Sequence, residues 1–202
     1  VMFNNIYENK KVLVTGHTGF KGTWLTAWLL KLGANVVGIS KDIPTTPSMF
    51  EELNLNEKIS HYFEDIRDLS KITQIISDEK PKFLFHLAAQ PIVSTSYSDP
   101  IETISSNVMG TANILEALKI SNHKCTVIII TSDKAYDNVE QVWGYKEDDK
   151  MGGKDIYSGS KGAAELIIKS YYYSFFKSES SNIKLAIGRA GNVIGGGDWA
   201  KD

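Results

Sequence analysis

The sequence has few of the features that mark secreted or membrane proteins. It holds one cysteine, Cys125, so no internal disulfide can form, and the apolar residues after it indicate a buried, inert thiol. No apolar run approaches the roughly 20 residues that a membrane-spanning helix needs. The polar residues 1–11 also lack the apolar core of a signal peptide. These absences predict a protein of the reducing cytoplasm.

The chain also lacks the charge and histidine patterns of nucleic-acid-binding and metal-binding proteins. Its formal net charge is −2, and its 22 lysines and arginines are scattered rather than gathered in a basic stripe. Its four histidines lie far apart in the sequence and show no metal-ligand spacing. We therefore expect no nucleic-acid partner, no membrane partner and no metal site. The length of 202 residues favours one domain with a substantial core.

What the sequence does contain is a regular alternation of strand-like and helix-like segments. The expected strands are 11–15, 35–40, 61–63, 82–87, 126–131 and 183–188. The expected helices are 19–32, 49–53, 69–78, 103–120 and 157–176. Nearly continuous apolar strands separated by helices predict an α/β fold. We expect a Rossmann-type, doubly wound parallel sheet with helices on both faces and right-handed crossovers.

The most informative motif lies at the first strand–helix junction. It consists of Gly16, Gly19 and Gly22 at three-residue spacing, with Thr18, Phe20 and Lys21 between them. Glycines let the backbone approach a dinucleotide pyrophosphate, and the amides at the start of the next helix point at its charge. The motif predicts a nicotinamide dinucleotide site, although a tight turn that binds nothing would show the same glycines.

The segment after this turn has the pattern of an amphipathic helix. One of its faces carries Trp24, Leu25, Trp28, Leu29 and Leu32, and Gly33 follows as a helix stop. This pattern supports the interpretation of the motif as strand, turn and helix.

The last residues of the sequence, 195–202, are loop-like, and no element that would close the fold follows them. We expect residues 1–202 to form the NAD-binding domain of a truncated enzyme, with a small substrate-binding domain beyond residue 202. A compact protein with a loose tail is the alternative.

Tyr157 and Lys161 form the first candidate for chemistry. They are four residues apart at the start of an expected helix, so their side chains lie on one face. A tyrosine ionises at about pH 10, and a neighbouring ammonium lowers that pKa. The pair would then take a proton from a sugar hydroxyl while hydride leaves the same carbon, and the lysine would also bind the nicotinamide ribose. Tyr7–Lys11 and Tyr173–Lys177 share the spacing, but only Tyr157 opens a helix after the fifth strand, where the carboxyl ends of parallel strands form a site.

The second candidate is the polar run Thr131, Ser132, Asp133 and Lys134 after the expected fifth strand. Such a run is either a site at the mouth of the strand or a simple turn. Its place beside the tyrosine–lysine helix favours a site.

Other candidate residues follow the remaining strands, and most of them have two interpretations. Ser40 stands where a dinucleotide places its adenosine ribose. Asp65 and Ile66 would hold the adenine or form a turn. The segment Leu87, Ala88, Ala89 and Gln90 would lie against the cofactor or pack tightly.

Two asparagines complete the candidates. Asn107 would bridge backbone groups at a helix kink or face solvent. Asn192 would contact the substrate or the nicotinamide.

Together these segments resemble the extended short-chain dehydrogenase/reductase family, in its NAD-dependent epimerase/dehydratase group. That family shares the glycine spacing and the Tyr-x-x-x-Lys pair. Within it the likeness is greatest to the dehydratases that act on CDP-glucose. The stretches that carry it are 16–22, 88–91, 107–111, 131–134, 143–145, 151–153 and 189–200. Lys134 is part of this likeness, because the related dTDP-glucose dehydratases have glutamate there.

The resemblance implies a lyase that acts on a nucleotide-sugar, CDP-glucose, with NAD as cofactor. Tyr157 would remove the proton of the 4-hydroxyl, Ser132 would hydrogen-bond the 4-oxygen, and Asp133 would protonate the departing 6-hydroxyl. Lys134 would lie near C5, either as a neutral base or as a cation that stabilises the enolate. The resemblance also implies a homodimer or higher oligomer in which the two long helices pair across a twofold axis.

The residues themselves leave two points open. No acidic residue ends the second strand, where Ser40 and Lys41 stand with Asp42 beyond. Lys41 would favour the 2′-phosphate of NADP, so only the resemblance favours NAD. The alternative functions are a nucleotide-sugar 4-epimerase, another nucleotide-sugar dehydratase and a non-catalytic NAD-binding module, although binding alone does not require both Tyr157 and Lys161.

Overall fold

Six parallel strands form the centre of the molecule in the computed structural model, which describes residues 2–200. The strands are β1 (Lys11–Thr15), β2 (Asn35–Ser40), β3 (Ser60–Phe63), β4 (Phe83–His86), β5 (Cys125–Ser132) and β6 (Ile183–Ala190). They pair side by side in the order β3-β2-β1-β4-β5-β6, which is the order of dinucleotide-binding Rossmann sheets. The predicted fold class and all six predicted strands are confirmed.

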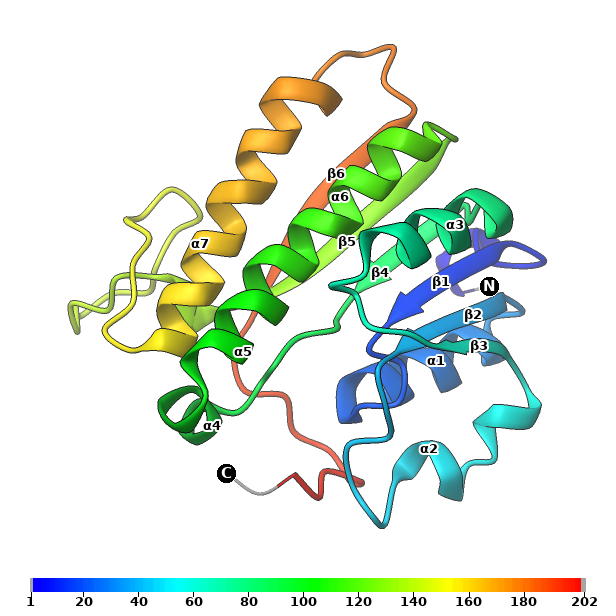
Figure 1. Cartoon of the computed structure of the whole chain (residues 1–202), viewed down its shortest axis with the longest axis horizontal. Coiled ribbons are helices and arrows are strands. Elements are labelled where there is room, and N and C mark those ends of the chain that lie inside the picture. Colours follow the sequence, from blue (N-terminus) through cyan, green and yellow to red (C-terminus); the bar gives the residue numbers. More distant parts are fainter. Residues whose placement is uncertain (1, 201–202) are drawn as a thin grey trace.

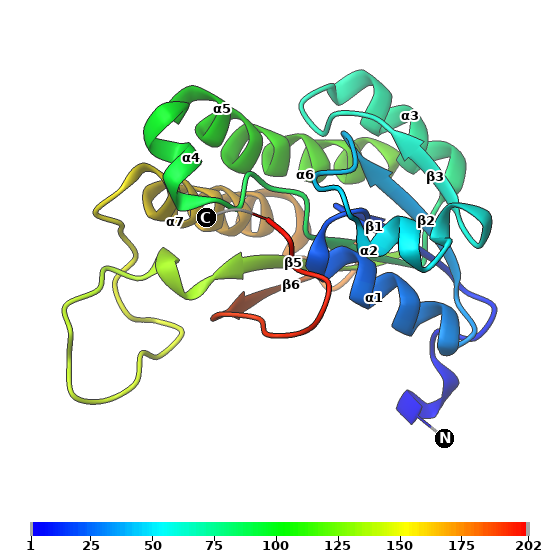
Figure 2. The same cartoon turned by 90° about the horizontal axis from the view of Figure 1, so that it is seen from below.

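Seven α-helices connect the described strands. They are α1 (Phe20–Lys31), α2 (Met49–Glu52), α3 (Leu69–Glu79), α4 (Val93–Ser98), α5 (Pro100–Ile104), α6 (Gly110–Ser121) and α7 (Ile156–Tyr171). Helices α3, α6 and α7 cover one face of the sheet, and α1 lies on the other (Figures 1 and 2). No helix in the described part of the chain is long and apolar enough to cross a membrane.

The strand β1 shows how the two faces are filled. Its side chains alternate, so Leu13 packs under α3 and α6, whereas Val12 and Val14 pack with Leu29 of α1. The cover is thinner toward β6, where Ile187 keeps 37% of its surface exposed. The apolar strands therefore encode a sheet buried on both faces at its centre and more open at the β6 edge.

The helices differ from the sequence prediction in two respects. The predicted helix 103–120 includes a π-helical turn at Ser105–Met109 between α5 and α6, and the predicted helix 157–176 ends in another at Tyr172–Phe176. The predicted apolar face of α1 packs on the sheet only in part, since Leu29 is buried with Leu25 against it, whereas Trp24 and Trp28 are about half exposed. The buried residues of α1 are Gly22, Thr23, Thr26 and Leu29, so three small residues and one leucine pack where the helix lies close to the sheet.

A buried histidine ties three elements together under the glycine motif. His86 in β4 places Nδ1 2.7 Å from the hydroxyl of Thr15 and Nε2 3.1 Å from the hydroxyl of Thr111 in α6. Burial, and secondarily the charge of Lys161, lower the pKa of His86 to about 3. The imidazole therefore stays neutral in the fold at any pH near neutrality.

This shift predicts a pH dependence of stability. The pKa of His86 in the fold lies below the unfolded value of 6.5, so its contribution is present above about pH 6.5 and is lost as the pH falls toward 3. His86→Gln should reduce the slope of the unfolding free energy between pH 6.5 and 4 by up to about 1.4 kcal/mol per pH unit. Urea denaturation across this range measures both slopes. Equal slopes in the two proteins would contradict the prediction.

Candidate active site

The glycine motif forms a backbone surface with very little space beside it. Gly16 has a positive φ of 74°, and a side chain there would place its Cβ 2.8 Å from the backbone nitrogen of Ala88. A Cβ at Gly22 would lie 1.9 Å from the carbonyl oxygen of Gly16. Only glycine is compatible with both contacts. They bring the end of β1, the start of α1 and the end of β4 together.

The start of α1 has the properties of an anion site. Gly19 is its N-cap residue and no side chain caps the helix. The first amides of the helix are therefore left to a ligand or to water, and the positive end of the helix dipole points the same way. This geometry fits the pyrophosphate of a dinucleotide.

Thr18, Ser40 and His17 hold the glycine turn against the end of β2. The Thr18 hydroxyl donates to the carbonyl of Asp42 at 2.6 Å, and the Ser40 hydroxyl accepts from the Thr18 amide at 3.3 Å and lies 2.9 Å from His17 Nδ1. Burial lowers the pKa of His17 to about 4, so its ring is neutral. The structure thus places the Ser40 hydroxyl in an internal network at the expected ribose end.

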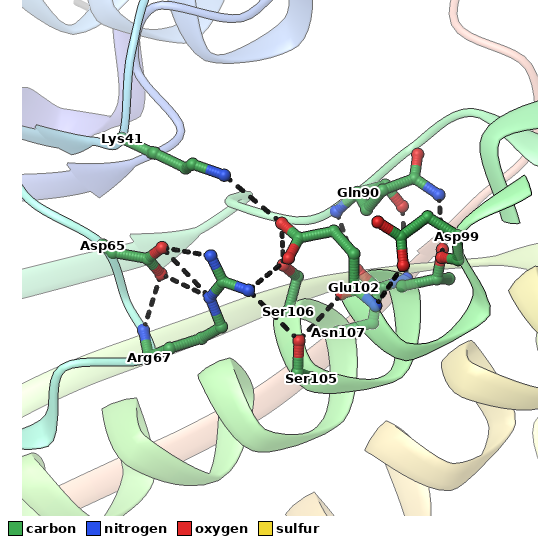
Figure 3. A network of polar contacts seen from close by, with 10 residues as sticks. Lys41, Asp65, Arg67, Gln90, Asp99, Glu102, Ser105, Ser106 and Asn107 are labelled. Atoms are coloured by element: carbon green, nitrogen blue, oxygen red, sulfur yellow. Dashed lines mark hydrogen bonds and ion pairs between the residues drawn. The ribbon is translucent and has the colours of Figure 1, made fainter.

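Two side chains, those of Thr15 and Asn107, hold the segment that follows β4. The Thr15 hydroxyl accepts from the amides of Leu87 and Ala88 at 3.1 and 3.2 Å. Asn107 accepts from the Gln90 amide at 2.8 Å and donates to the Gln90 carbonyl at 3.2 Å (Figure 3). The segment packs tightly beside the glycine turn, so the packing interpretation is confirmed, and its contact with a cofactor stays a prediction.

Asn107 links the segment after β4 to α7, the helix that carries Tyr157 and is called the tyrosine helix below. It is 2% exposed, lies in the π-helical turn Ser105–Met109, and donates a second hydrogen bond to Ser160 of α7 at 2.9 Å. The predicted bridge at a helix kink is therefore confirmed and the solvent-facing alternative is wrong. The extra residue of a π turn aims the amide inward.

Tyr157 and Lys161 lie in the first turns of α7, and each is 8% exposed. Asp155 caps the helix by accepting from the Ser158 amide at 2.9 Å. The ammonium of Lys161 lies 5.8 Å from the centre of the Tyr157 ring. One helix face therefore presents both groups, as the spacing predicted.

The pKa of Tyr157 shifts in the opposite direction to the sequence expectation. Burial raises it, the charges of Asp133 and Asp155 raise it further, and a hydrogen bond with Ser132 lowers it. The net shift is upward because desolvation and two carboxylates outweigh the hydroxyl. Burial, together with the charge of Lys21, lowers the pKa of Lys161 to about 8.

The polar run after β5, Ser132 to Lys134, lies beside Tyr157. The Ser132 hydroxyl donates to the Asp133 carboxylate at 3.0 Å and accepts from the Lys134 amide at 3.2 Å. The side chains of Asp133 and Lys134 are exposed. Asp133 also acts on the pKa values of Lys21 and Tyr157, so the glycine motif, the polar run and the tyrosine helix converge.

Sequence reasoning assigned no role to a buried ion pair beside this run. Arg189 of β6 makes two close contacts to Glu165 of α7, which is 4% exposed and accepts from the Thr131 hydroxyl at 2.6 Å. The guanidinium also stacks 4.5 Å from the centre of the Tyr136 ring. A glutamate four residues after Lys161 on a buried helix face was the available signal. The Thr131 hydroxyl is engaged in this internal network.

The remaining candidates lie at the rims of the site. Residues 191–200 run from the end of β6 back toward α1 (Figure 2), where Trp24 Nε1 donates to the Gly196 carbonyl at 3.0 Å. Asn192 is exposed in this segment. At the β3 end, Asp65 binds Arg67, and the Ile66 side chain is buried against α6. Residues 2–200 contain no cluster of three metal-ligating side chains.

Comparisons with known proteins agree with this geometry. The model of a family described as GDP-mannose 4,6 dehydratase matches residues 13–191. CDP-glucose 4,6-dehydratase of Salmonella typhimurium is 53% identical over 98% of this chain and 56% of the relative, and CDP-paratose 2-epimerase of Salmonella typhi is 27% identical over 94% and 59%. The chain therefore spans a little more than half the length of these relatives.

A solved structure also resembles the chain. UDP-glucuronic acid 4-epimerase from Bacillus cereus, in complex with UDP-glucuronic acid and NAD, superposes with a TM-score of 0.74 at 31% identity. The superposition covers 89% of this chain and 55% of the epimerase.

Proposed function

The chain belongs to the GDP-mannose 4,6-dehydratase family, whose model matches most of its length, and on that premise we propose that the complete protein dehydrates CDP-glucose to CDP-4-keto-6-deoxyglucose with NAD as cofactor. The observation that carries the proposal is the placement of the glycine turn after β1, the polar run after β5 and Tyr157 at the start of α7 near the carboxyl edge of one parallel sheet, with α7 packed against the turn that follows β5. The similarity to a CDP-glucose 4,6-dehydratase supports the choice of nucleotide-sugar.

Glycines and helix amides would hold the cofactor, and side chains of β5 and α7 would act on the sugar. The pyrophosphate would lie on the uncapped start of α1. Bound NAD would take the hydride from C4 of the sugar and return it to C6, so that the reaction has no net redox change. Lys161 would bind the nicotinamide ribose, with its pKa of about 8 leaving it mainly charged at pH 7.

The proton transfers at the 4-oxygen and at the 6-hydroxyl each have a candidate residue in this chain, and one further residue would lie near C5. Tyr157 would accept the proton of the 4-hydroxyl, with Ser132 hydrogen-bonded to the same oxygen. Loss of the C5 proton and of the 6-hydroxyl would release water, with Asp133 protonating the leaving hydroxyl, and C5 would regain a proton as hydride returns to C6. Lys134 would stand near C5, as base or as a cation that stabilises the enolate. Since burial raises the pKa of Tyr157, the proton transfer requires cationic groups close to the phenol.

The first test measures turnover. The complete protein, incubated with CDP-glucose, should form a product with the alkaline absorbance of a 4-keto-6-deoxysugar and without net release of NADH. Tyr157→Phe should lower kcat by at least about 100-fold, since it removes the general base. Tyr173→Phe serves as the matched control, because Tyr173 lies at the far end of the tyrosine helix and is 57% exposed. Accumulation of free NADH, or unchanged turnover in Tyr157→Phe, would overturn the proposal.

The second test separates the dehydratase from a 4-epimerase, which oxidises C4 but eliminates no water. Asp133→Asn removes the acid that would protonate the 6-hydroxyl. We expect dehydration to be abolished, while single-turnover oxidation at C4, followed as reduced cofactor at 340 nm, continues. Equal loss of both steps would contradict the role of Asp133, and an epimerised product would favour the epimerase.

We also propose that α5, α6 and α7 pair with a second copy of the chain. Figure 1 shows these helices side by side on one face, and they expose large apolar side chains, among them Met109 at 55% and Leu166 at 56%. Covering such a patch is favourable because it removes apolar surface from water.

Sedimentation of the complete protein tests this pairing. We expect a dimer or higher oligomer for the wild type and a shift toward monomer for Leu166→Glu, which would bury a charge in the interface. Val142→Glu is the control, because Val142 is 97% exposed in the loop between β5 and α7. A monomeric wild type, or an unchanged oligomer in Leu166→Glu, would contradict the pairing.

A further inference from the structure

Two cations and two carboxylates meet beside the ends of β2 and β3. Lys41, which directly follows β2, lies 3.3 Å from Glu102 Oε1 (Figure 3). Arg67, which follows β3, makes ion pairs with both Asp65 and Glu102. The charge of Lys41 also acts on the pKa of Asp65, which the Arg67 hydrogen bond holds below its usual value. The four groups form one network whose formal charges cancel.

The position of this network in the sheet bears on which dinucleotide, NAD or NADP, would bind. In Rossmann sheets the adenosine ribose lies at the end of the second strand, where an acidic residue accepts its 2′-hydroxyl or an arginine accommodates a 2′-phosphate. This chain has Ser40 at that strand end, with two cations close by. Lys41 and Arg67 are the type of residue that would bind a 2′-phosphate, but each is already paired with a carboxylate.

Glu102 is held in place for this pairing although it comes from a different part of the fold. It lies in α5, where its amide is capped by the Asp99 carboxylate at 3.0 Å. Its Oε1 accepts from the Ser106 hydroxyl at 3.2 Å, while its other oxygen accepts from Arg67. The carboxylate therefore bridges Lys41 and Arg67 with both oxygens engaged, and its orientation does not depend on Lys41 alone.

We propose that Glu102 makes the cofactor site selective for NAD over NADP by neutralising the two cations that would otherwise attract a 2′-phosphate. A phosphate at this position would meet a network of zero net charge and would compete with Glu102 for both cations. The inference rests on the proposed function, because it presupposes that the glycine motif binds a nicotinamide dinucleotide.

Dissociation constants of NADH and NADPH, measured by fluorescence titration of the complete protein, test the inference without reference to turnover. The wild type should bind NADH more tightly than NADPH. Glu102→Gln should strengthen NADPH binding about tenfold and change NADH binding less than about twofold, since it leaves one unpaired positive charge. The gain should shrink at high salt.

Two further variants assign the effect to Lys41. The double variant Glu102→Gln with Lys41→Met should lose most of the gain in NADPH affinity. Lys41→Glu, a change at a side chain that is 56% exposed, should weaken NADPH binding further and spare NADH. Lys41→Glu therefore tests the role of the Lys41 charge independently, even if Glu102→Gln folds poorly.

The matched control removes a glutamate charge in the same way, but at the amino ends of the strands rather than at the carboxyl ends of β2 and β3. Glu79 pairs with Lys11 at 2.7 Å at the start of β1, so Glu79→Gln should leave the ratio of the two dissociation constants unchanged. Wild-type protein that binds neither dinucleotide would overturn the proposed function. Wild-type protein that binds NADH, with a ratio unaffected by Glu102→Gln and by Lys41→Glu, would overturn this inference alone.

Discussion

The close contact between the backbones of Gly16, Gly22 and Ala88 is the constraint on which the candidate site depends. Because no Cβ fits at either glycine, β1, α1 and β4 approach one another more closely than side chains would allow. The approach leaves the first amides of α1 uncapped and brings Lys21 near Asp133 and Lys161.

Buried polar groups carry this arrangement from one end of the site to the other. His86 joins Thr15 to Thr111, and Asn107, one turn away, joins Gln90 to Ser160 of the tyrosine helix. Each of these groups is almost fully buried and has its partners in the fold, so removing one would leave another unpaired. Because the Thr111 hydroxyl also donates to the Asn107 carbonyl at 2.7 Å, one hydrogen-bond network joins the end of β4 to α7.

Much of the fold could be predicted because strand order and helix position follow from local pattern. The apolar runs 11–15 and 126–131 lie within strands, and the Tyr157–Lys161 spacing put both groups on one helix face, as observed. The π turn at Ser105–Met109 could not be predicted, since its residues are compatible with an ordinary helix and only the contacts of Asn107 reveal its purpose. The packing face of α1 was predicted only in part, because periodicity places Trp24 and Trp28 on the same face as Leu29 although both tryptophans are about half exposed.

The sequence by itself determined the Rossmann class, the glycine turn and the residue types available for acid–base chemistry, because these depend on periodicity and on residues close together in the chain. The tertiary structure decided which charged groups are paired and how easily the titratable groups ionise. Whether Lys41 is a free cation depends on Glu102, 61 residues away, and whether Tyr157 ionises easily depends on burial and on carboxylates from two different segments. Electrostatic energies depend on the distance between charges and on solvent exposure. For residues far apart in the sequence, both quantities are known only from the folded structure.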